Sequence, residues 1–378
     1  MAALRTSALR SRPFSSSCTA VGIPLRTFST TRAHTSGERM KGVLMTNYGS
    51  PEVLQYSENL PLPELGPRDV LVRVHYSSLN PIDVAIRSGY GRELLSKLRT
   101  PSLPCVLGYD CVGTVTKVGT EVWNWAEGDK VWGATDVLRN GCHAEYVAVN
   151  EHLLAPLPKT IPEEEAAGIP YVGLTSWRAL VDVAKLVPNE NKKILVHGGG
   201  GGVGYFSLQL LKAWGFSVAT TCSTANVAKL QAILNQNDQI VDYKKEDFTK
   251  RLHPEFDIIL DTVGGIEMET KNLALLKSTG HYLSLKGPLL TETDNSGLFQ
   301  GLISGANQIA QKKVSSGTKR FDYVLYKPNG DALQKITSLV EAKQITGNVD
   351  SMYNLNQLQF AHSYFEHHKA HGKVIIKI

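Results

Sequence analysis

Short hydrophobic runs, broken by glycine, proline and charged residues, fill the chain from Met40 to about Pro158. Runs of this length, bounded by turn residues such as "LGPRD" (65–69) and "AEGD" (126–129), predict β-strands. Many short strands of this kind favour a compact β-barrel. The expected strands cover residues 41–45, 69–80, 111–119, 129–133 and 143–149.

From about Glu163 the pattern changes to an alternation of apolar runs with amphipathic stretches at helical spacing. This alternation predicts a right-handed, doubly wound parallel sheet. The expected strands cover residues 193–197, 216–222, 239–243, 256–265 and 281–285. The expected helices begin near Phe206 and cover 225–234 and 269–280. Residues 286–318 are expected to form an irregular insertion, followed by a helix from Asp331, a helix over 355–368 and a strand over 373–378.

The length of 378 residues is long for one domain and suits two. The content of 42% hydrophobic and 20% charged residues is typical of an ordinary soluble globular protein. No apolar run approaches the roughly 20 residues that cross a bilayer, which argues against a spanning helix. The cysteines show no paired spacing, so we expect free thiols in a reducing compartment. They are Cys18, Cys105, Cys111, Cys142 and Cys222.

Residues 1–39 differ from the rest of the chain, because they are rich in arginine, serine and threonine and contain no acid before Glu38. This composition is typical of a mitochondrial transit peptide, and "RTFS" (26–29) resembles a matrix-peptidase pattern cleaved after Phe28. The alternative is a generic disordered tail. Cleavage would remove four arginines and lower the formal net charge from +5 to +1, which leaves no basic surface for nucleic acid.

Five consecutive glycines, 198–202, stand between an expected strand and an expected helix. Glycine is costly to order, so such a run needs a physical reason. One reason is close approach of the backbone to a phosphate at the positive end of the helix. The spacing Gly199-x-Gly201-x-x-Gly204 also matches the dinucleotide fingerprint in its usual strand-to-helix context. We therefore expect a phosphate-binding turn; the alternative is a purely structural one.

The end of the second expected strand, "TTCST" (220–224), indicates which coenzyme is used. A site for NADH usually has Asp or Glu there to bind the ribose hydroxyls, and this strand has neither. Ser223 can donate to a 2′-phosphate, Lys229 can add charge, and Tyr243 ends the third strand within reach. NADPH is therefore favoured over NADH. The alternative is that Ser223 caps the next helix, and one side chain can do both.

Six motifs occur in a familiar order: "VLMTNYGSPEVL", "SSLNPIDVAIRSGYG", "LPCVLGYDCVGTVTKVG", "EGDKVWG", "IPYVGLTSWRAL" and "VHGGGGGVG". In this order the chain from Met40 to Ile378 resembles the zinc-independent quinone oxidoreductases of the medium-chain dehydrogenase/reductase superfamily. The resemblance implies an α/β fold in which a doubly wound parallel (Rossmann) domain is nested in a GroES-like β-barrel. The implied segments are a leader (1–39), the barrel (40–165), the NADPH-binding domain (166–321) and a return to the barrel (322–378).

The resemblance also implies the residues that contact NADPH. Those of the glycine turn would hold the diphosphate, those at the next two strand ends the adenosine phosphate, and the later ones the nicotinamide. In chain order they are Gly200, Gly201, Gly202, Val203, Ser223, Tyr243, Leu285, Gly287, Tyr326, Lys369, Ala370 and His371. The chain departs from the family at 198–200, where Ala or Ser is usual, and this should loosen the turn.

No metal is expected. Zinc alcohol dehydrogenases of the superfamily have Gly-His-Glu where this chain has "GYD" (108–110), so Tyr109 replaces a ligand. Cys142 and His143 are neighbours on an expected strand and would point to opposite faces. The histidines near the C-terminus, His362, His367, His368 and His371, are explained by a solvated helix end.

Without a metal, a bound nicotinamide would pass hydride to an acceptor that needs little Lewis-acid help. Quinones and α,β-unsaturated carbonyls qualify, because the added charge delocalises onto oxygen. Asn80, Asp83 and Tyr90 occupy a loop that faces the nicotinamide in the family. Related enoyl-thioester reductases have a tyrosine near Tyr90, which makes Tyr90 the candidate proton donor. The alternative is a packing tyrosine, with Asp83 capping the local turn.

The expected function is therefore an NADPH-dependent reductase of quinones or enones in the mitochondrial matrix, connected by the resemblance to ubiquinone metabolism. An alternative is an NADPH-binding redox sensor or interaction factor with little turnover. A zinc alcohol dehydrogenase is nearly excluded by the missing ligands. The resemblance also implies a homodimer and a reticulon-type protein partner; no nucleic acid is expected.

Overall fold

The computed structural model describes residues 37–99, 102–367 and 370–378, and a parallel sheet of six strands lies at the centre of its second half. The strand order is β11-β10-β9-β12-β13-β14, and every neighbouring pair is parallel. Two sets of strands are thus added on opposite sides of β9, as expected for a doubly wound sheet. The strands are β9 (Lys193–His197), β10 (Ser217–Cys222), β11 (Gln239–Asp242), β12 (Phe256–Asp261), β13 (Leu276–Ser284) and β14 (Arg320–Tyr323).

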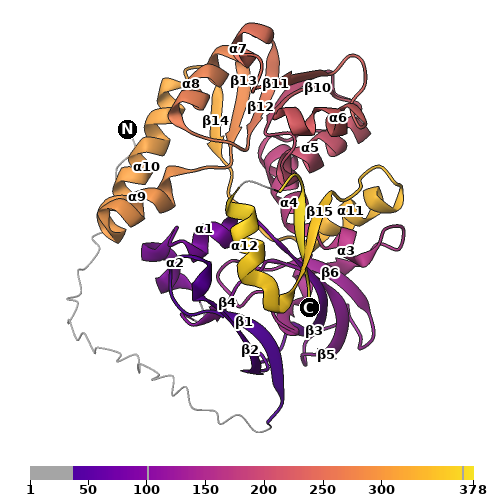
Figure 1. The fold of residues 1–378 in the computed structure, drawn as a ribbon. Helices are drawn as coiled ribbons and strands as arrows, with labels where there is room; N and C mark the ends of the chain where they lie inside the picture. The colour runs from indigo at the N-terminus through magenta and orange to yellow at the C-terminus, as the bar shows by residue number, and fades with distance from the viewer. Residues whose placement is uncertain (1–36, 100–101, 368–369) are drawn as a thin grey trace, which may run out of the picture. The chain divides into compact units, whose positions relative to one another are not determined.

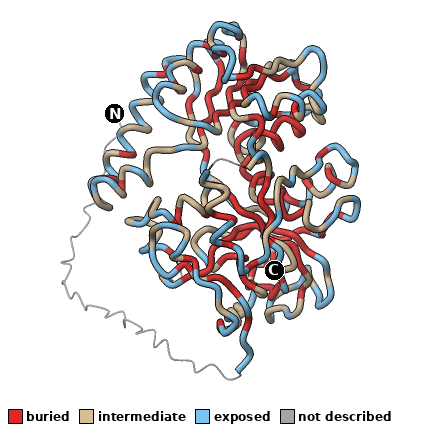
Figure 2. The backbone as a smooth tube through the Cα atoms, viewed as in Figure 1, coloured by how far each residue is buried: buried red, intermediate tan, exposed pale blue. Residues whose placement is uncertain are grey.

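Side chains that alternate along these strands enter two different cores, one on each face of the sheet. Ile194 and Val196 of β9 belong to a cluster with α4 and α5, whereas Leu195 packs with residues of α7 and α8. The parallel sheet is therefore buried on both faces, as Figure 2 shows by its buried strands. The helices of this part are α4 (Pro170–Trp177), α5 (Gly202–Ala213), α6 (Val227–Gln231), α7 (Phe248–Arg251) and α8 (Ile266–Leu275). The π-helical turn η3 (Arg178–Val183) continues α4, and η4 (Thr224–Asn226) precedes α6.

The first part of the chain forms a second sheet together with the C-terminal strands β15 (Val349–Asn354) and β16 (Lys373–Lys377). Its order is β15-β16-β3-β5-β6-β8, with β7 also paired to β3. The strands β1, β2 and β4 form a separate sheet in the order β2-β1-β4. The first-part strands are β1 (Arg39–Met45), β2 (Leu54–Pro61), β3 (Asp69–Leu79), β4 (Cys105–Val106), β5 (Asp110–Val118), β6 (Lys130–Ala134), β7 (Tyr146–Asn150) and β8 (Leu154–Pro156). Its helices are η1 (Pro51–Val53), α1 (Pro81–Arg87), α2 (Arg92–Leu98), η2 (Glu151–Leu153) and α3 (Glu163–Ala166).

The C-terminal segment returns to this sheet. Strand β16 pairs antiparallel with β3, so that Val374 lies opposite Leu79 and Ile375 opposite Ser78. This pairing places the start of β16 beside the start of the Asn80 loop. The returning elements are α11 (Gly330–Glu341), β15 (Val349–Asn354), η5 (Leu355–Gln357), α12 (Leu358–Glu366) and β16 (Lys373–Lys377).

The expectation of an irregular insertion over 286–318 is wrong. The segment forms two helices, α9 (Pro288–Ser296) and α10 (Leu298–Ser315), drawn in orange in Figure 1. Its glycines resemble helix breakers, but they lie where the two helices touch. A Cβ at Gly301 would collide with the backbone of Thr293, and one at Gly305 would lie 3.0 Å from Cα of Leu289. Glycine here permits close packing of the two helices, a reason that only tertiary structure reveals.

The predicted helix over 269–280 is also wrong in its second half. Helix α8 ends at Leu275, and β13 begins at Leu276, which pairs with Phe256 of β12. Leu276 is buried in the core that covers β12. Sheet pairing thus overrides the helical pattern of the local sequence.

Two further expectations concern membranes and thiols. Within the described residues, no helix is both long and apolar enough to span a bilayer. The four described cysteines, Cys105, Cys111, Cys142 and Cys222, are all buried free thiols. Cys18 and most of the predicted leader lie outside the described residues.

Candidate functional site

The glycine turn between β9 and α5 is tightly enclosed by protein on one side. Gly198 has φ +74°, which favours glycine. A Cβ at Gly199 would collide with the hydroxyl of Thr220, and one at Gly200 with the side-chain amide of Asn226. These three glycines are required by the protein's own packing. Their neighbours leave no room for Ala or Ser, and the expectation that the glycines loosen the turn stays a prediction.

Gly201 differs from the other glycines of the turn because it is exposed. It precedes α5 with an ordinary extended backbone (φ −80°, ψ 167°), and a Cβ there would meet only the carbonyl oxygen of Gly198, at 3.4 Å. Gly202 and Val203 open the helix and are partly exposed. A bare backbone at the positive end of a twelve-residue helix fits the diphosphate of a dinucleotide.

A buried polar network, which was not predicted from the sequence, lies beside the glycine turn and holds it in place. His197 Nδ1 lies 2.9 Å from the hydroxyl of Thr221, and its Nε2 lies 2.6 Å from Oδ1 of Asn272. The backbone N–H of Gly199 donates to the carbonyl of Thr221 at 2.9 Å. Burial lowers the pKa of His197, so the imidazole is neutral and can hold both partners.

Ser223 and Tyr243 follow two paired strands, β10 and β11, and the structure brings them together. The backbone N–H of Tyr243 donates to the carbonyl of Cys222 at 3.1 Å. The hydroxyl of Ser223 accepts from Nδ2 of Asn226 at 3.1 Å, so its own proton is free to donate to a ligand. Tyr243 is exposed beside it. This arrangement can accept an adenosine phosphate.

A carboxylate also lies at this edge of the sheet, and the sequence argument did not include it. Asp242 ends β11, and its Oδ2 accepts from the hydroxyl of Thr224 at 2.6 Å. Its Oδ1 accepts from the backbone N–H of Lys244 at 3.0 Å, and the ammonium of Lys245 lies 3.7 Å away. The hydrogen bond from Thr224 is the main reason that the pKa of Asp242 is lowered. Its oxygens are thus already occupied, and its charge is balanced by Lys245.

Lys229, which the sequence predicts near the 2′-phosphate, has its ammonium bound to the C-terminal segment instead. Its ammonium donates to the carbonyl of His371 at 2.6 Å and lies 4.9 Å from the ring centre of Tyr205. Burial lowers its pKa. The backbone N–H of His371 donates to Asp350 at 2.9 Å, so the segment with Ala370 and His371 is held from two sides. Lys369, predicted beside them, lies outside the described residues.

The other residues predicted to contact the coenzyme lie just after β13 and β14 in the chain. The N–H of Leu285 donates to the carbonyl of Asp261 at 3.0 Å, which continues the β12–β13 pairing past the strand end. Gly287 precedes α9, and the hydroxyl of Tyr326 donates to the carbonyl of Thr135 at 3.1 Å. Tyr326 therefore links the segment after β14 to the segment after β6.

Asp110 is the centre of a buried polar cluster at the start of β5. Its Oδ1 accepts from the backbone N–H of Tyr171 at 2.6 Å, and its Oδ2 from Nδ2 of Asn80 at 2.8 Å and from the hydroxyl of Ser78. The ammonium of Lys373 lies 3.4 Å from Oδ2 and donates to Oδ1 of Asn80 at 2.5 Å. Lys373 is only 5% exposed. Both ends of the Asn80 amide are therefore occupied.

Lys373 also touches the coenzyme turn. A Cβ at Gly202 would lie 3.4 Å from Cδ of Lys373 and 2.9 Å from Cγ1 of Val172. The stem of this lysine thus runs beside the first residue of α5, and its ammonium reaches the start of the Asn80 loop. The cluster joins the predicted phosphate site to the loop that faces the nicotinamide in related proteins.

Asp83 fixes the first turn of that loop. Its Oδ2 accepts from the N–H of Asn80 at 2.8 Å and its Oδ1 from the N–H of Gly108 at 2.9 Å. Complete burial raises the pKa of Asp83 to about 7, although these two N–H groups act in the opposite direction. The capping role that the sequence allowed is therefore present.

Tyr90 lines a small cavity of about 10 Å³, together with Tyr48, Ile86 and Leu95 of the first part of the chain. A volume of this size holds about one water molecule and no quinone. Burial, followed by the charge of Asp294, raises the pKa of Tyr90. These contacts favour a packing role, and the role of Tyr90 as proton donor stays a prediction.

Comparison with known proteins places the chain among relatives. The family described as "Alcohol dehydrogenase GroES-like domain" matches residues 66–159, and "Zinc-binding dehydrogenase" matches 236–376. The protein named NAD(P)H oxidoreductase RTN4IP1, mitochondrial, from Dictyostelium discoideum is 36% identical over 354 residues, which are 89% of this chain and 99% of that protein. The chain belongs to the medium-chain dehydrogenase/reductase family. The family resemblance deduced from the motifs is thereby confirmed, as is its likeness to mitochondrial reticulon-interacting oxidoreductases.

Two further relatives of this chain have other names. The 2-methylene-furan-3-one reductase of Solanum lycopersicum is 31% identical over 346 residues, covering 89% of this chain and 79% of that protein. The solved quinone oxidoreductase of Coxiella burnetii is 30% identical, with a TM-score of 0.75, and covers 90% of this chain and 100% of its own. The predicted fold, a Rossmann sheet combined with a GroES-like barrel, is confirmed.

One matched family is described as zinc-binding, so the side chains of this protein that could act as metal ligands need examination. The described part of the chain has no group of three or more His, Cys, Asp or Glu side chains placed to hold a metal. Tyr109, which the family resemblance places where zinc enzymes have a histidine ligand, is fully buried. His362 is also buried, whereas His367 and His371 are exposed, so these histidines do not form one site.

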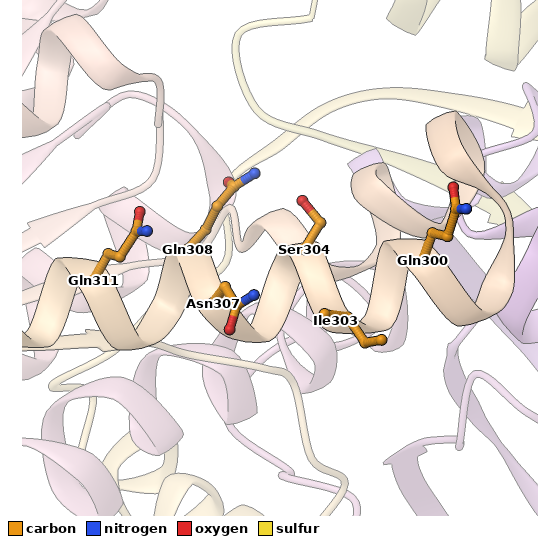
Figure 3. Close-up of a pocket in the computed structure, with 6 residues that line it drawn as sticks. All are labelled: Gln300, Ile303, Ser304, Asn307, Gln308 and Gln311. Atoms are coloured by element: carbon orange, nitrogen blue, oxygen red, sulfur yellow. The ribbon is translucent and has the colours of Figure 1, made fainter.

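A larger hollow lies away from all these residues, along α10 (Figure 3). Its lining is made of amides, one hydroxyl and one isoleucine: Gln300, Ile303, Ser304, Asn307, Gln308 and Gln311. It has no titratable group and no link to the glycine turn. We therefore take the region between the turn and the Asp110 cluster as the candidate functional site of this chain.

Proposed function

We propose that this chain is a mitochondrial oxidoreductase that uses NADPH to reduce quinones or α,β-unsaturated carbonyls without a metal. The observation that carries the proposal is the turn at Gly201, a bare backbone at a helix start, with the free hydroxyl of Ser223 at the next strand end. Relatives named NAD(P)H oxidoreductase and 2-methylene-furan-3-one reductase support the reaction class. The predicted leader and the relatives named mitochondrial support the location, with the matrix and a link to ubiquinone as further expectations.

The coenzyme would be held along the line of residues that the family resemblance indicates. Gly200, Gly201, Gly202 and Val203 would hold the diphosphate by their backbone, and Ser223 and Tyr243 the 2′-phosphate. Leu285, Gly287, Tyr326, Ala370 and His371 would enclose the nicotinamide, with Lys369 as a further contact. The bound coenzyme supplies the hydride. The protein's part is to orient the acceptor, exclude water and supply a proton.

The proposal that no metal takes part rests on the side chains that are available as metal ligands. Tyr109 is fully buried and, by the family resemblance, occupies the position at which a zinc site has a histidine. The negative charge of Asp110 is already balanced by the ammonium of Lys373. The positive charge of the Lys373 ammonium would also repel a metal cation at this place. The segment boundaries 40–165, 166–321 and 322–378, the homodimer and the reticulon-type partner stay predictions.

Fluorescence titration of the purified protein with NADPH and NADH tests the coenzyme, and NADPH oxidation over a panel of quinones and enones tests the reaction. We expect NADPH to bind more tightly than NADH. In Ser223→Asp, we expect at least about a tenfold loss of NADPH affinity with NADH affinity retained, because a carboxylate repels the 2′-phosphate. Equal affinity for both coenzymes in the wild type would refute the argument from Ser223.

One observation favours the second candidate function, an NADPH-binding interaction factor with little turnover. Helix α10 exposes large apolar side chains one turn apart on the same face, with Phe299 77% and Ile303 50% exposed. Neighbouring exposed apolar side chains, unlike single scattered ones, are typical of protein contacts. Tight NADPH binding without oxidation by any acceptor in the panel would favour this candidate.

A further inference from the structure

Tyr171 is held at the junction of two buried cores. It lies in the first turn of α4, where its backbone N–H donates to Oδ1 of Asp110 at 2.6 Å. Its ring packs against both the core of the parallel sheet and the core of the barrel. The next residue, Val172, contacts Gly202 at the start of α5. Tyr171 is therefore fixed beside both the coenzyme turn and the Asp110 cluster.

The ring of Tyr171 belongs to a row of three tyrosines. It stacks on Tyr326, with ring centres 4.3 Å apart and planes at 26°, and lies 6.1 Å from the ring of Tyr109. The stacking leaves the ring little freedom to rotate out of place. Tyr326 is one of the residues that the family resemblance places over the nicotinamide.

The hydroxyl of Tyr171 differs from those of its two neighbours. That of Tyr326 is bound to the carbonyl of Thr135, and that of Tyr109 is sealed in the barrel. Tyr171 is partly exposed, and its hydroxyl has no hydrogen-bond acceptor among the described residues. A phenol whose ring is rigidly held and whose hydroxyl makes no hydrogen bond is a donor without an acceptor.

We propose that Tyr171 is the catalytic residue that donates a proton to the oxygen of the acceptor. The inference rests on the proposed function. For an enone, hydride forms a C–H bond at the β-carbon, the π electrons move to the oxygen, and the O–H bond of Tyr171 breaks as its proton joins that oxygen. For a quinone, the same hydride and proton give the hydroquinone. The phenolate then regains a proton from water, so that the acceptor gains two electrons and two hydrogens in all.

The surroundings of Tyr171 suit this role. Burial first, and then the nearby groups Asp83, Tyr109, Asp110 and Tyr90, raise its pKa well above the usual value. The hydroxyl therefore keeps its proton until a strong oxygen base is formed beside it. Tyr90, the rival, faces a cavity too small for an acceptor.

Three phenylalanine variants separate the possibilities, each measured beside the wild type with duroquinone as acceptor. In Tyr171→Phe we expect kcat/KM for duroquinone to fall about 100-fold, a typical loss for a general acid. The affinity for NADPH should stay within about twofold, because the ring and its stacking remain. Tyr90→Phe tests the rival donor, and the distant surface variant Tyr56→Phe should keep the wild-type rate.

A binding measurement without turnover gives a second readout. With the oxidised coenzyme NADP⁺, duroquinone cannot be reduced, and its affinity follows from fluorescence quenching. Loss of one hydrogen bond in Tyr171→Phe should raise the dissociation constant about two- to tenfold. An unchanged rate and an unchanged constant in this variant, or a large loss in Tyr90→Phe instead, would overturn the role of Tyr171 alone. A wild type that binds NADPH but reduces no acceptor would overturn both this role and the proposed reaction.

Discussion

At the scale of single residues, the glycine turn shows that neighbouring glycines can be required for different reasons. Gly199 and Gly200 lack side chains because Thr220 and Asn226 occupy the space. Gly201 has open space and an ordinary backbone, so nothing in the protein itself demands glycine there. A ligand is the remaining physical reason for glycine at that position.

This difference predicts opposite results for two alanine variants. Gly201→Ala should leave the free energy of unfolding within about 1 kcal/mol of the wild type. It should lower NADPH affinity at least about tenfold, because the methyl group occupies the space of the diphosphate. Gly200→Ala should destabilise the fold, since its Cβ collides with Asn226. Urea unfolding and fluorescence titration measure the two effects, and unchanged NADPH binding in Gly201→Ala would contradict the assignment.

The buried carboxyl of Asp83 predicts that the stability of the protein depends on pH. Its burial determines the sign of this dependence. Its pKa is about 7 in the folded protein and about 3.8 in the unfolded chain, so the folded state binds the proton more tightly. The free energy of unfolding should therefore fall as pH rises between about 4 and 7, by up to about 1.4 kcal/mol per pH unit. Urea unfolding at several pH values should show a flatter profile for Asp83→Asn; an identical slope in both proteins would refute the shift.

At the scale of elements, the contact between α9 and α2 joins segments about 200 positions apart. Oδ2 of Asp294 in α9 accepts from the N–H of Gly91 at 2.5 Å, and its Oδ1 from the N–H of Glu93 at 3.2 Å. The carboxylate therefore caps α2 in the way that an N-cap residue of the same helix would. The contact also holds the end of the loop that contains Tyr90.

Removing this cap should loosen the contact locally. In Asp294→Ala we expect a cost of about 1 kcal/mol, and faster hydrogen exchange in residues 91–98 and 288–315. Exchange at the glycine turn should not change. The neighbouring exposed residue provides the control, and Asn295→Ala should behave as the wild type. Equal exchange in both variants would show that the cap has no role in holding the helices.

At the scale of the whole molecule, the returning C-terminal strand completes the site. Lys373 of β16 forms an ion pair with Asp110, a residue 263 positions earlier, and also binds Asn80. Both partners are buried, so removal of the cation would leave a buried carboxylate without its counter-charge.

Two methionine variants in the same strand test this link. Lys373→Met should lower the free energy of unfolding by about 3–5 kcal/mol. Lys377→Met, at the exposed end of β16, should change it by no more than about 0.5 kcal/mol. Denaturant unfolding of both variants gives the comparison. Similar small losses in the two would mean that the ion pair contributes little.

The sequence by itself determined the parts of this protein that depend on local pattern. Alternating strands and helices predicted the doubly wound sheet, the glycine run predicted a turn from strand to helix, and the strand-end residues Ser223 and Tyr243 could be paired by strand order. These inferences work because periodicity and backbone conformation are written in neighbouring residues.

Only the tertiary structure decided the features that depend on distant partners. The glycines of α10 looked like helix breakers until the close contact with α9 explained them. Asp242 lies at the coenzyme edge of the sheet because β11 pairs with β10. Tyr171 is held by Asp110 and Tyr326, which are far from it in the chain. Packing between segments so widely separated depends on the whole fold, and no local pattern of residues encodes it.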